Sequence, residues 1–166
     1  MNIINNTLYD KDLILRYNKF YAGSYMVKNF IVITVISIAF IIYMLIQQEW
    51  AYAGILVGIL ALYYLLTLGM QKLTTNRMLK RSPLVDNPMT QTYVFLEESF
   101  SVTNVKSYNV DYKDIQTVKK AKDFYMIQTS DRKTYIVDFK GFEKEEDIFT
   151  LGNFFNQKLN LKMKLQ

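Results

Sequence analysis

Two long apolar stretches dominate the pattern of hydrophobic and polar positions in this chain. They cover residues 30–46 and 51–70, and only Gln47–Trp50 separates them. As helices, the second would be about 30 Å long and the first about 26 Å, and a bilayer's hydrocarbon core is about 30 Å thick. Four residues cannot carry the chain back through lipid. The pattern therefore predicts a transmembrane hairpin whose ends, Phe30 and Met70, lie on one side.

Basic residues predict which side that is. Segments 1–28 and 71–81 each carry four Lys or Arg residues, whereas 47–50 carries none. Under the positive-inside rule, both termini are cytoplasmic and the protein is a multi-pass protein of the cell membrane. The basic residues predicted to contact lipid headgroups are Lys28, Lys72, Arg77, Lys80 and Arg81.

Composition limits the chemistry that the chain can perform. It has 166 residues, so one small domain of roughly 80 residues fits after the hairpin. It contains no Cys and no His, which excludes disulfides, the common zinc sites and histidine acid–base catalysis. We expect no enzyme activity, no catalytic residue, no cofactor and no metal. The net charge is +5 over residues 1–85 and zero over 86–166, which favours membrane lipid over nucleic acid as a partner.

The chain before the hairpin is predicted to form a strand and a helix. Residues 2–8 are compatible with a short strand, and Asp10 or Asp12 can cap a helix that continues toward the membrane. This helix is either amphipathic and interfacial or a plain lead-in to the first span. We therefore divide the N-terminal half into residues 1–28, a strand and an amphipathic helix, and 29–81, the hairpin with a juxtamembrane extension.

After the hairpin, the spacing of apolar residues changes from a helical pattern to the alternation typical of β-strands. Pro83 and Pro88 mark residues 82–88 as a linker, and a domain is predicted over 89–166. Its alternating pattern, rich in Val, Ile, Tyr, Phe and Thr, predicts six antiparallel strands at 92–97, 99–104, 105–111, 114–121, 123–129 and 133–139. Residues 143–160 then predict an amphipathic helix with acidic residues in its first turn.

The predicted core of this domain is aromatic. The helix is expected to close the sheet with one face, and the strands to supply the opposing rings. The core residues assigned on this basis are Phe95, Phe124, Tyr135, Phe149, Leu151, Phe155 and Leu159.

Small residues in the second span indicate close helix packing. Gly54 and Gly58 form a small-xxx-small motif, and Ala61 follows one turn later. The motif fits packing within the hairpin, a homodimer, or contact with a partner's transmembrane helix. Neither span contains an ionisable residue, which argues against a transporter or channel.

The order of these elements resembles the YcxB-like membrane proteins. The resemblance rests on two membrane helices followed by TYVFLEESFSVTN, YNVDYKDIQTVKKAKDFYMIQ and TYIVDFKGF, and then by an acidic-to-aromatic helix. It implies an α+β membrane protein with a pleckstrin-homology-like (PH-like) domain, a partial antiparallel β-barrel of seven strands capped by the C-terminal helix. Only six strands are countable after Pro88, so residues 2–8 are the candidate for the seventh. The family's common Pro-Lys pair is absent, since the region reads Val137–Lys140.

Two functions fit this organisation. The first is a membrane-anchored, non-catalytic module that binds an unidentified protein or peptide at the cytoplasmic face. The alternative is immunity against a bacteriocin or another membrane-active toxin, because small two-span proteins with PH-like domains resemble immunity factors. Phosphoinositide binding is disfavoured, since the first hairpin of the domain carries Glu97 and Glu98 where lipid-binding PH domains carry basic residues.

Overall fold

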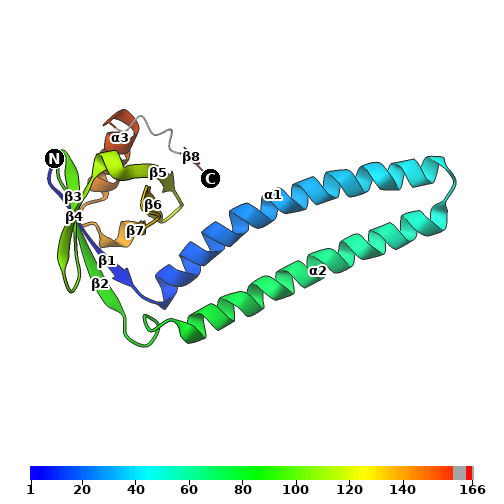
Figure 1. The fold of residues 1–166 in the computed structure, drawn as a ribbon, viewed down its shortest axis with the longest axis horizontal. Helices are drawn as coiled ribbons and strands as arrows, with labels where there is room; N and C mark the ends of the chain where they lie inside the picture. The colour runs from blue at the N-terminus through cyan, green and yellow to red at the C-terminus, as the bar shows by residue number, and fades with distance from the viewer. Residues whose placement is uncertain (159–163, 166) are drawn as a thin grey trace. The chain divides into compact units, whose positions relative to one another are not determined.

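The computed structural model describes residues 1–158 and 164–165, and the chain divides into two compact units (Figure 1). One unit, here called the domain, combines Met1–Leu13 with Pro83–Gln166. The other, here called the hairpin, is Ile14–Ser82. The domain therefore includes an N-terminal segment that the predicted range 89–166 leaves out.

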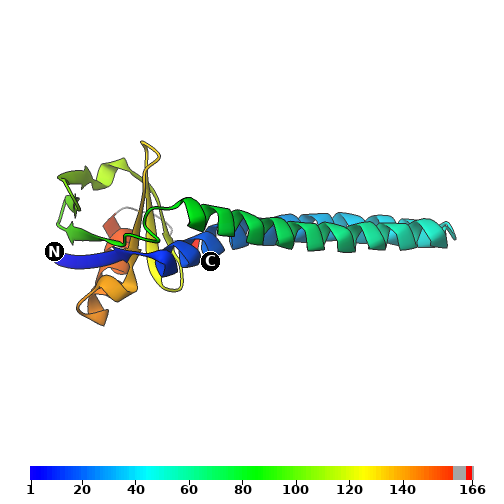
Figure 2. The same ribbon diagram turned by 90° about the horizontal axis from the view of Figure 1, so that it is seen from below.

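The hairpin consists of two antiparallel helices that run side by side (Figures 1 and 2). They are α1 (Lys11–Ile46), which starts in the domain, and α2 (Trp50–Arg81), and both are long and apolar enough to span a membrane. Asp10 caps α1 by accepting the Leu13 N–H at 2.8 Å, as one of the two predicted caps. In the turn, Gln48 has a left-handed φ of 62°.

The first sheet has the strand order β1-β2-β3-β4. Its strands are β1 (Ile3–Tyr9), β2 (Met89–Phe95), β3 (Ser99–Thr103) and β4 (Ser107–Asp111), and all neighbours are antiparallel. β1 and β2 pair from Ile3↔Phe95 to Tyr9↔Met89, although the whole hairpin separates them in sequence. The N-terminal segment thus supplies a seventh strand in addition to the six strands β2–β7 that follow the hairpin.

The second sheet has the order β7-β6-β5-β8 and follows a short 3₁₀ helix, η1 (Tyr112–Asp114). Its strands are β5 (Ile115–Lys120), β6 (Phe124–Thr129), β7 (Thr134–Asp138) and the two-residue β8 (Lys164–Leu165), which pairs in parallel with β5. After β7 come η2 (Phe139–Gly141) and α3 (Glu145–Lys158). Among the described residues the two sheets do not form a closed barrel.

The core of the domain is aromatic and lies between the two sheets and α3. Phe155 of α3 has no exposed surface. Its ring meets Phe95 of the first sheet at 6.1 Å and Tyr125 of the second at 5.9 Å, both edge to face. The Tyr125 hydroxyl also donates to the Ile148 carbonyl of α3 at 2.8 Å. One helix residue therefore joins both sheets.

Polar side chains of β1 join the sheets on another side. Asn5 Nδ2 donates to the Asp138 carbonyl at 2.7 Å, and Thr7 Oγ1 accepts the Asp138 N–H at 2.9 Å. The Tyr9 hydroxyl accepts from Ile136 N–H and donates to the Ile136 carbonyl, each at 3.2 Å. Side chains of every second residue of β1 therefore form hydrogen bonds with N–H and C=O groups at the edge of β7. Another strand could otherwise pair with these main-chain groups.

Gly141 allows the chain to pass β1 closely after η2. A Cβ built on Gly141 would lie 2.6 Å from the carbonyl oxygen of Asn6. Asn5 also forms an isolated bridge with Phe142. Glycine is required here by the close approach of two backbones, because its φ is not positive.

Candidate functional site

A cleft of about 270 Å³ in the domain is the candidate binding site. It opens between β4 of the first sheet and the β6–β7 turn of the second. The lining residues are Tyr108, Asn109 and Val110 of β4, Asp114 of η1, Thr129, Ser130, Asp131 and Lys133 at the turn, and Tyr135 of β7. The site therefore combines a strand edge with polar side chains.

The edge that borders the cleft belongs to β4. Because β4 is the last strand in the order of the first sheet, only β3 pairs with it among the described residues. The edge of β7 meets the side chains of β1, and β5 pairs with β8 at Lys119 and Lys120. Of the sheet edges in the described part of the chain, that of β4 lies beside a cleft.

The β6–β7 turn is held in one shape by its own hydrogen bonds. Thr129 N–H donates to the Lys133 carbonyl and Arg132 N–H donates to the Thr129 carbonyl, both at 3.0 Å. Arg132 takes a left-handed φ of 65°. Ser130 N–H donates to the Asp114 carbonyl at 2.8 Å, which ties the turn to η1. The wall of the cleft is therefore built by main-chain contacts.

Two polar pairs set the electrostatics of the cleft. The Lys133 ammonium lies 2.8 Å from Asp131, and this hydrogen bond, together with one from Thr129, lowers the pKa of the Asp131 carboxyl to about 2. Burial, followed by a hydrogen bond with Tyr108, raises the pKa of Tyr135. At neutral pH the cleft therefore presents a compensated ion pair beside the neutral phenol of Tyr135.

Such groups suit recognition of a polar main chain. A strand edge offers N–H and C=O groups in an alternating row, and hydroxyls beside it can donate or accept. Ser130 has the carboxylate of Asp131 next to it in sequence, but that carboxylate accepts from Lys133 and Thr129. The arrangement gives a surface for hydrogen bonding and does not present a nucleophile activated by a base.

Most of the predicted core residues are buried, but not all of them. Phe95, Phe124, Tyr135, Leu151 and Phe155 are all buried. Phe149 does not belong to the core, because its side chain is 64% exposed. Ile148 faces the core instead, and one residue corresponds to about 100° around a helix. The Phe149 ring lies on the surface with the Lys120 ammonium 5.6 Å from its centre. Leu159 lies outside the described residues.

The predicted helix-packing motif does not face the other helix of the hairpin. A Cβ built on Gly54 or Gly58 would meet nothing within 4 Å, and Ala61 is exposed. The small residue that is buried in α2 is Ala53, which is 5% exposed. Because Gly54 lies one position later, it points about 100° away from Ala53. Packing within the hairpin is therefore not the role of the motif.

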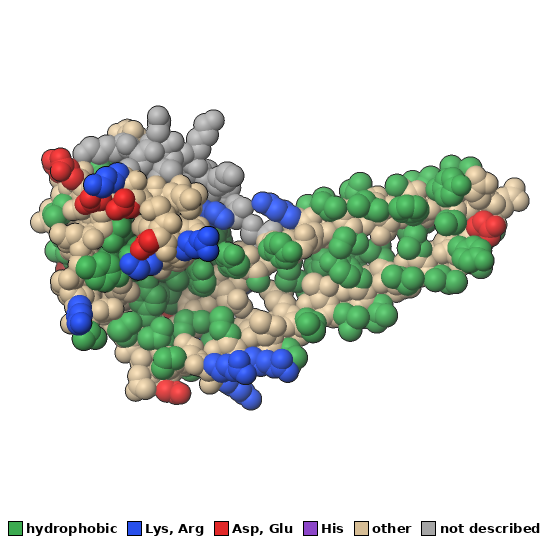
Figure 3. All heavy atoms as spheres, viewed as in Figure 1, with side chains coloured by type: hydrophobic (Ala, Val, Ile, Leu, Met, Phe, Trp, Pro, Cys, Tyr) green, Lys and Arg blue, Asp and Glu red, His purple; other side chains and the backbone are tan. Residues whose placement is uncertain are grey.

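The predicted headgroup-contacting residues Lys28, Lys72, Arg77, Lys80 and Arg81 are all exposed. Figure 3 shows hydrophobic side chains along both helices and Lys and Arg side chains at the end of α2 away from the turn.

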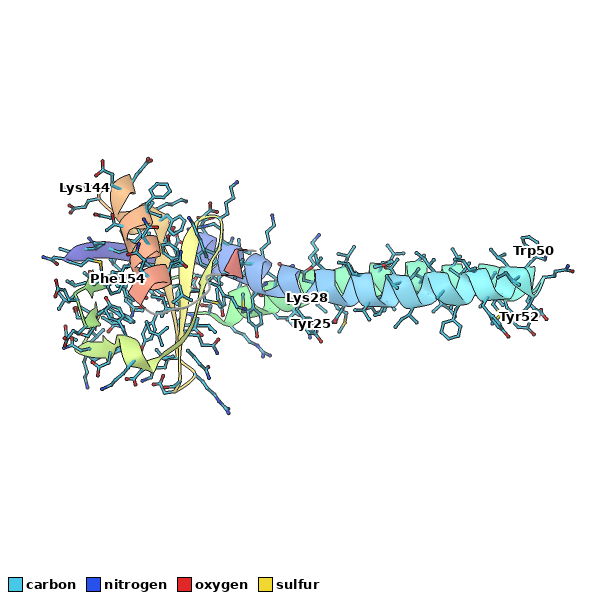
Figure 4. All side chains as sticks on the ribbon, turned by 90° about the horizontal axis from the view of Figure 1, so that it is seen from above. Tyr25, Lys28, Trp50, Tyr52, Lys144 and Phe154 are labelled. Atoms are coloured by element: carbon cyan, nitrogen blue, oxygen red, sulfur yellow. The ribbon has the colours of Figure 1, made fainter. Side chains whose placement is uncertain are left out.

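Large aromatic residues lie toward the two ends of the hairpin. Trp50 and Tyr52 lie near the turn, and Tyr25 lies with Lys28 toward the other end (Figure 4). Trp50 is 69% and Tyr25 68% exposed. Exposed aromatic residues at two levels are typical of the interfaces of a membrane.

Sequence reasoning did not identify the cleft or the polar residues of β1. Alternation gives no clear signal for the latter, because Asn5 and Thr7 share a strand face with Ile3, and Asn6 shares the other face with Ile4 and Leu8. Each face mixes polar and apolar residues, so the pattern does not show which face is buried. Nothing in the local sequence brings residues 108–110 next to residues 129–135.

The comparison with known proteins supports the family assignment. Residues 95–155 match the family model described as YcxB-like protein. The predicted resemblance is confirmed over this segment, which runs from the end of β2 to Phe155 of α3, whereas β1 and the hairpin lie outside it. No curated protein and no solved structure was found to match the chain.

Proposed function

We propose that this protein is a membrane-anchored binding module. Helices α1 and α2 span the cell membrane, and the domain is held at the cytoplasmic face, where it binds a segment of a protein partner without catalysing a reaction. The observation that carries the proposal is the pairing of β1 with β2, which makes the apolar hairpin an insertion within a folded domain.

The surface of the hairpin supports membrane insertion. None of the residues in the most apolar window of α1 is buried, and in α2 the buried share is 6%. Exposed side chains include Ile36 at 52%, Leu65 at 69% and Leu66 at 60%. A soluble helix pair would leave this apolar surface in water, whereas lipid is a favourable solvent for it.

The β1–β2 pairing also supports the proposed topology. Tyr9 and Met89 are register partners, so the chain enters and leaves the hairpin at neighbouring positions. Both crossings must then begin and end on one side of the membrane. The Lys and Arg residues of segments 1–28 and 71–81 favour the cytoplasm as that side.

The arrangement of the domain supports a PH-like assignment. Seven strands, β1–β7, form two antiparallel sheets, and α3 contributes Leu151 and Phe155 to the core between them. The match to the YcxB-like family lies within this part of the chain. We infer that the domain, like other modules of this architecture, acts through a surface and not through an active site.

The cleft beside β4 is the proposed binding surface. An extended peptide can add to the edge of a sheet, where main-chain hydrogen bonds supply affinity and neighbouring pockets supply specificity. The two phenols and the Asp131–Lys133 pair are positioned to contact the side chains of such a peptide. A photo-crosslinker at Asn109 should form an adduct in native membranes. The same group at the exposed Asn153 of α3 should not, and equal adducts at both sites would contradict the proposed surface.

Cysteine labelling tests the topology, because the natural chain has no cysteine. Gln48→Cys in the turn should react with a membrane-impermeant thiol reagent in intact cells. Asn2→Cys should react only after the cells are opened. Labelling of Asn2→Cys in intact cells would reverse the orientation.

A hairpin exchange separates the two functions that the sequence suggested. Residues 14–82 are replaced by an unrelated two-span hairpin, and both parts of the domain, 1–13 and 83–166, are retained. A binding module needs its hairpin for location, so the crosslink at Asn109 should persist. An immunity protein that contacts its toxin through the spans should lose protection of a challenged host, although its domain stays folded.

A further inference from the structure

The edge of β4 differs from the edge of β5 in the residues along it. Residues 107–111 contain no Lys and no Pro, and β4 pairs with β3 in a single register. β5 carries Lys119 and Lys120, and its register with β6 shifts between Ile115 and Thr117. Lysine, proline and an irregular register all protect edge strands against pairing with another chain. The edge of β4 lacks these features, and among the described residues no strand covers it.

The hydrogen bonds between β3 and β4 show which main-chain groups of β4 point away from β3. Tyr112 N–H donates to the Glu98 carbonyl at 3.2 Å, directly after the last register pair of the ladder. Hydrogen-bonded and non-hydrogen-bonded pairs alternate in an antiparallel ladder, so every second residue of β4 before Tyr112 bonds to β3. The residues between them are Ser107, Asn109 and Asp111, which are all exposed. Their N–H and C=O groups therefore point outward.

These outward groups are arranged symmetrically about Asn109. When two β4 strands lie antiparallel with Asn109 of both copies opposite each other, Ser107 of each copy lies opposite Asp111 of the other. All three pairs then place outward N–H and C=O groups where each pair can exchange two hydrogen bonds. Asn109 lies on a twofold axis, and the strand is complementary to itself, as an isologous interface requires.

The polar side chains match in the same register. The Asn109 amide has both donors and an acceptor, so two such amides can bond to each other across the axis. The Ser107 hydroxyl would lie beside the partner subunit's Asp111. The Lys113 ammonium lies 2.9 Å from one oxygen of Asp111, and the other oxygen can accept the hydroxyl of the partner's Ser107. The side chains thus add hydrogen bonds to those of the main chain.

Packing, charge and anchoring also favour a second copy of this chain at this edge. Tyr108, 41% exposed, would lie opposite the partner subunit's Val110, and pairs of aromatic and β-branched side chains stabilise sheets. The net charge over residues 86–166 is zero, so two copies of this part carry no excess charge that would repel them. Two chains anchored in one membrane also meet at a high local concentration.

We propose that the strand bound at the edge of β4 is β4 of a second copy of this chain. The first sheets of the two copies then form one continuous sheet, with the twofold axis at Asn109. The cleft beside β4 leaves this edge accessible to a strand. The inference rests on the proposed function, because it names the partner of the binding surface already described.

Single cysteines test the register, because the natural chain has none. Asn109→Cys should give a disulfide-linked dimer when membranes are oxidised, since the Cα atoms of a hydrogen-bonded pair are about 5.5 Å apart, within the range of a disulfide. Ser107→Cys alone should not, because its two copies are offset by about 13 Å along the strands. Ser107→Cys and Asp111→Cys chains expressed together should crosslink. A monomeric Asn109→Cys, or equal crosslinking of Ser107→Cys alone, would overturn the proposal.

A proline at the twofold axis tests the main-chain pairing. Asn109→Pro removes an N–H that points away from β3, so the bonds between β3 and β4 remain. Asn109→Ala is the matched control, because it removes the side-chain amide and keeps the N–H. The dissociation constant of the dimer in detergent, measured by light scattering, should be at least about tenfold higher for Asn109→Pro than for Asn109→Ala. Equal dissociation constants would contradict strand pairing.

The photo-crosslink at Asn109 separates this inference from the proposed function. Adducts between two copies of the chain, with twice its mass, support both. Adducts with a different protein alone would overturn the inference and leave the binding surface in place. If no adduct forms, the binding surface itself is wrong, and the pairing of two copies with it.

Discussion

Large apolar side chains lie on the outside of the hairpin and on the inside of the domain. Leu65 of α2 is 69% exposed, whereas Phe95 and Phe155 of the domain are fully buried. Both regions contain many such residues, so hydrophobicity alone does not determine burial. The solvent determines it, because water drives apolar groups together and lipid does not. The hairpin is accordingly held by ring contacts such as Phe30–Tyr64 at 4.6 Å and by polar bonds such as Asn18–Thr75.

The contrast between hairpin and domain predicts that the domain folds without the hairpin but does not fold without β1. Removal of residues 2–9 should unfold the domain, because β2 loses its partner and β7 loses the side chains that meet its edge. Replacement of residues 14–82 by a short polar loop should leave a soluble, folded domain, since Tyr9 and Met89 are neighbours. Circular dichroism and limited proteolysis measure both outcomes. A folded domain in the first variant would show that β1 is dispensable.

A matched pair of truncations should show the largest contrast between single residues. Phe155→Ala should destabilise the domain by about 3–5 kcal/mol, because it empties the space between Phe95 and Tyr125. Leu65→Ala also removes a large apolar side chain, but from an exposed face, and should leave the melting temperature of the protein in detergent nearly unchanged. Similar losses for both variants would mean that the exposed face of α2 is packed against something.

Alkaline pH should destabilise the domain through its buried tyrosines. Burial raises the pKa of Tyr125 to about 12 and raises that of Tyr93 and Tyr112. Their contribution is complete below about pH 10, where tyrosines are neutral in both states, and is lost as the pH rises toward 12, because the unfolded chain ionises first. Denaturant titrations with tyrosinate absorbance measure this. Tyr125→Phe should reduce the slope with pH, and an unchanged slope would rule out Tyr125 as a contributor.

Two glycine substitutions give the smallest of these contrasts. Gly141→Ala should cost about 1–3 kcal/mol, because the new Cβ would lie 2.6 Å from the backbone of Asn6 and β1 must shift. Gly54→Ala should have no such cost, since a Cβ there meets nothing within 4 Å. The melting temperatures of the two variants and of the natural protein measure this difference in stability. A loss of stability for Gly54→Ala that depends on protein concentration would instead indicate a homodimer through this face.

The sequence by itself determined the elements and much of the core. Apolar length identified the two long helices, and alternation identified strands β2–β7 within a few residues. The predicted burial of Phe95 and Phe155 follows from the same periods. These features depend on residues close together in the chain, so a local pattern contains the information.

Only the tertiary structure decided which of these elements belong together. It paired β1 with β2 across the hairpin, placed Asn5, Thr7 and Tyr9 against β7, and brought β4 beside the β6–β7 turn to form the cleft. These outcomes depend on contacts between segments far apart in sequence, and local periodicity contains no information about such contacts. The predictions that Gly54 packs within the hairpin and that Phe149 lies in the core were wrong for a related reason. On a helix, one residue is about 100° of rotation, and the neighbouring element decides which direction is inward.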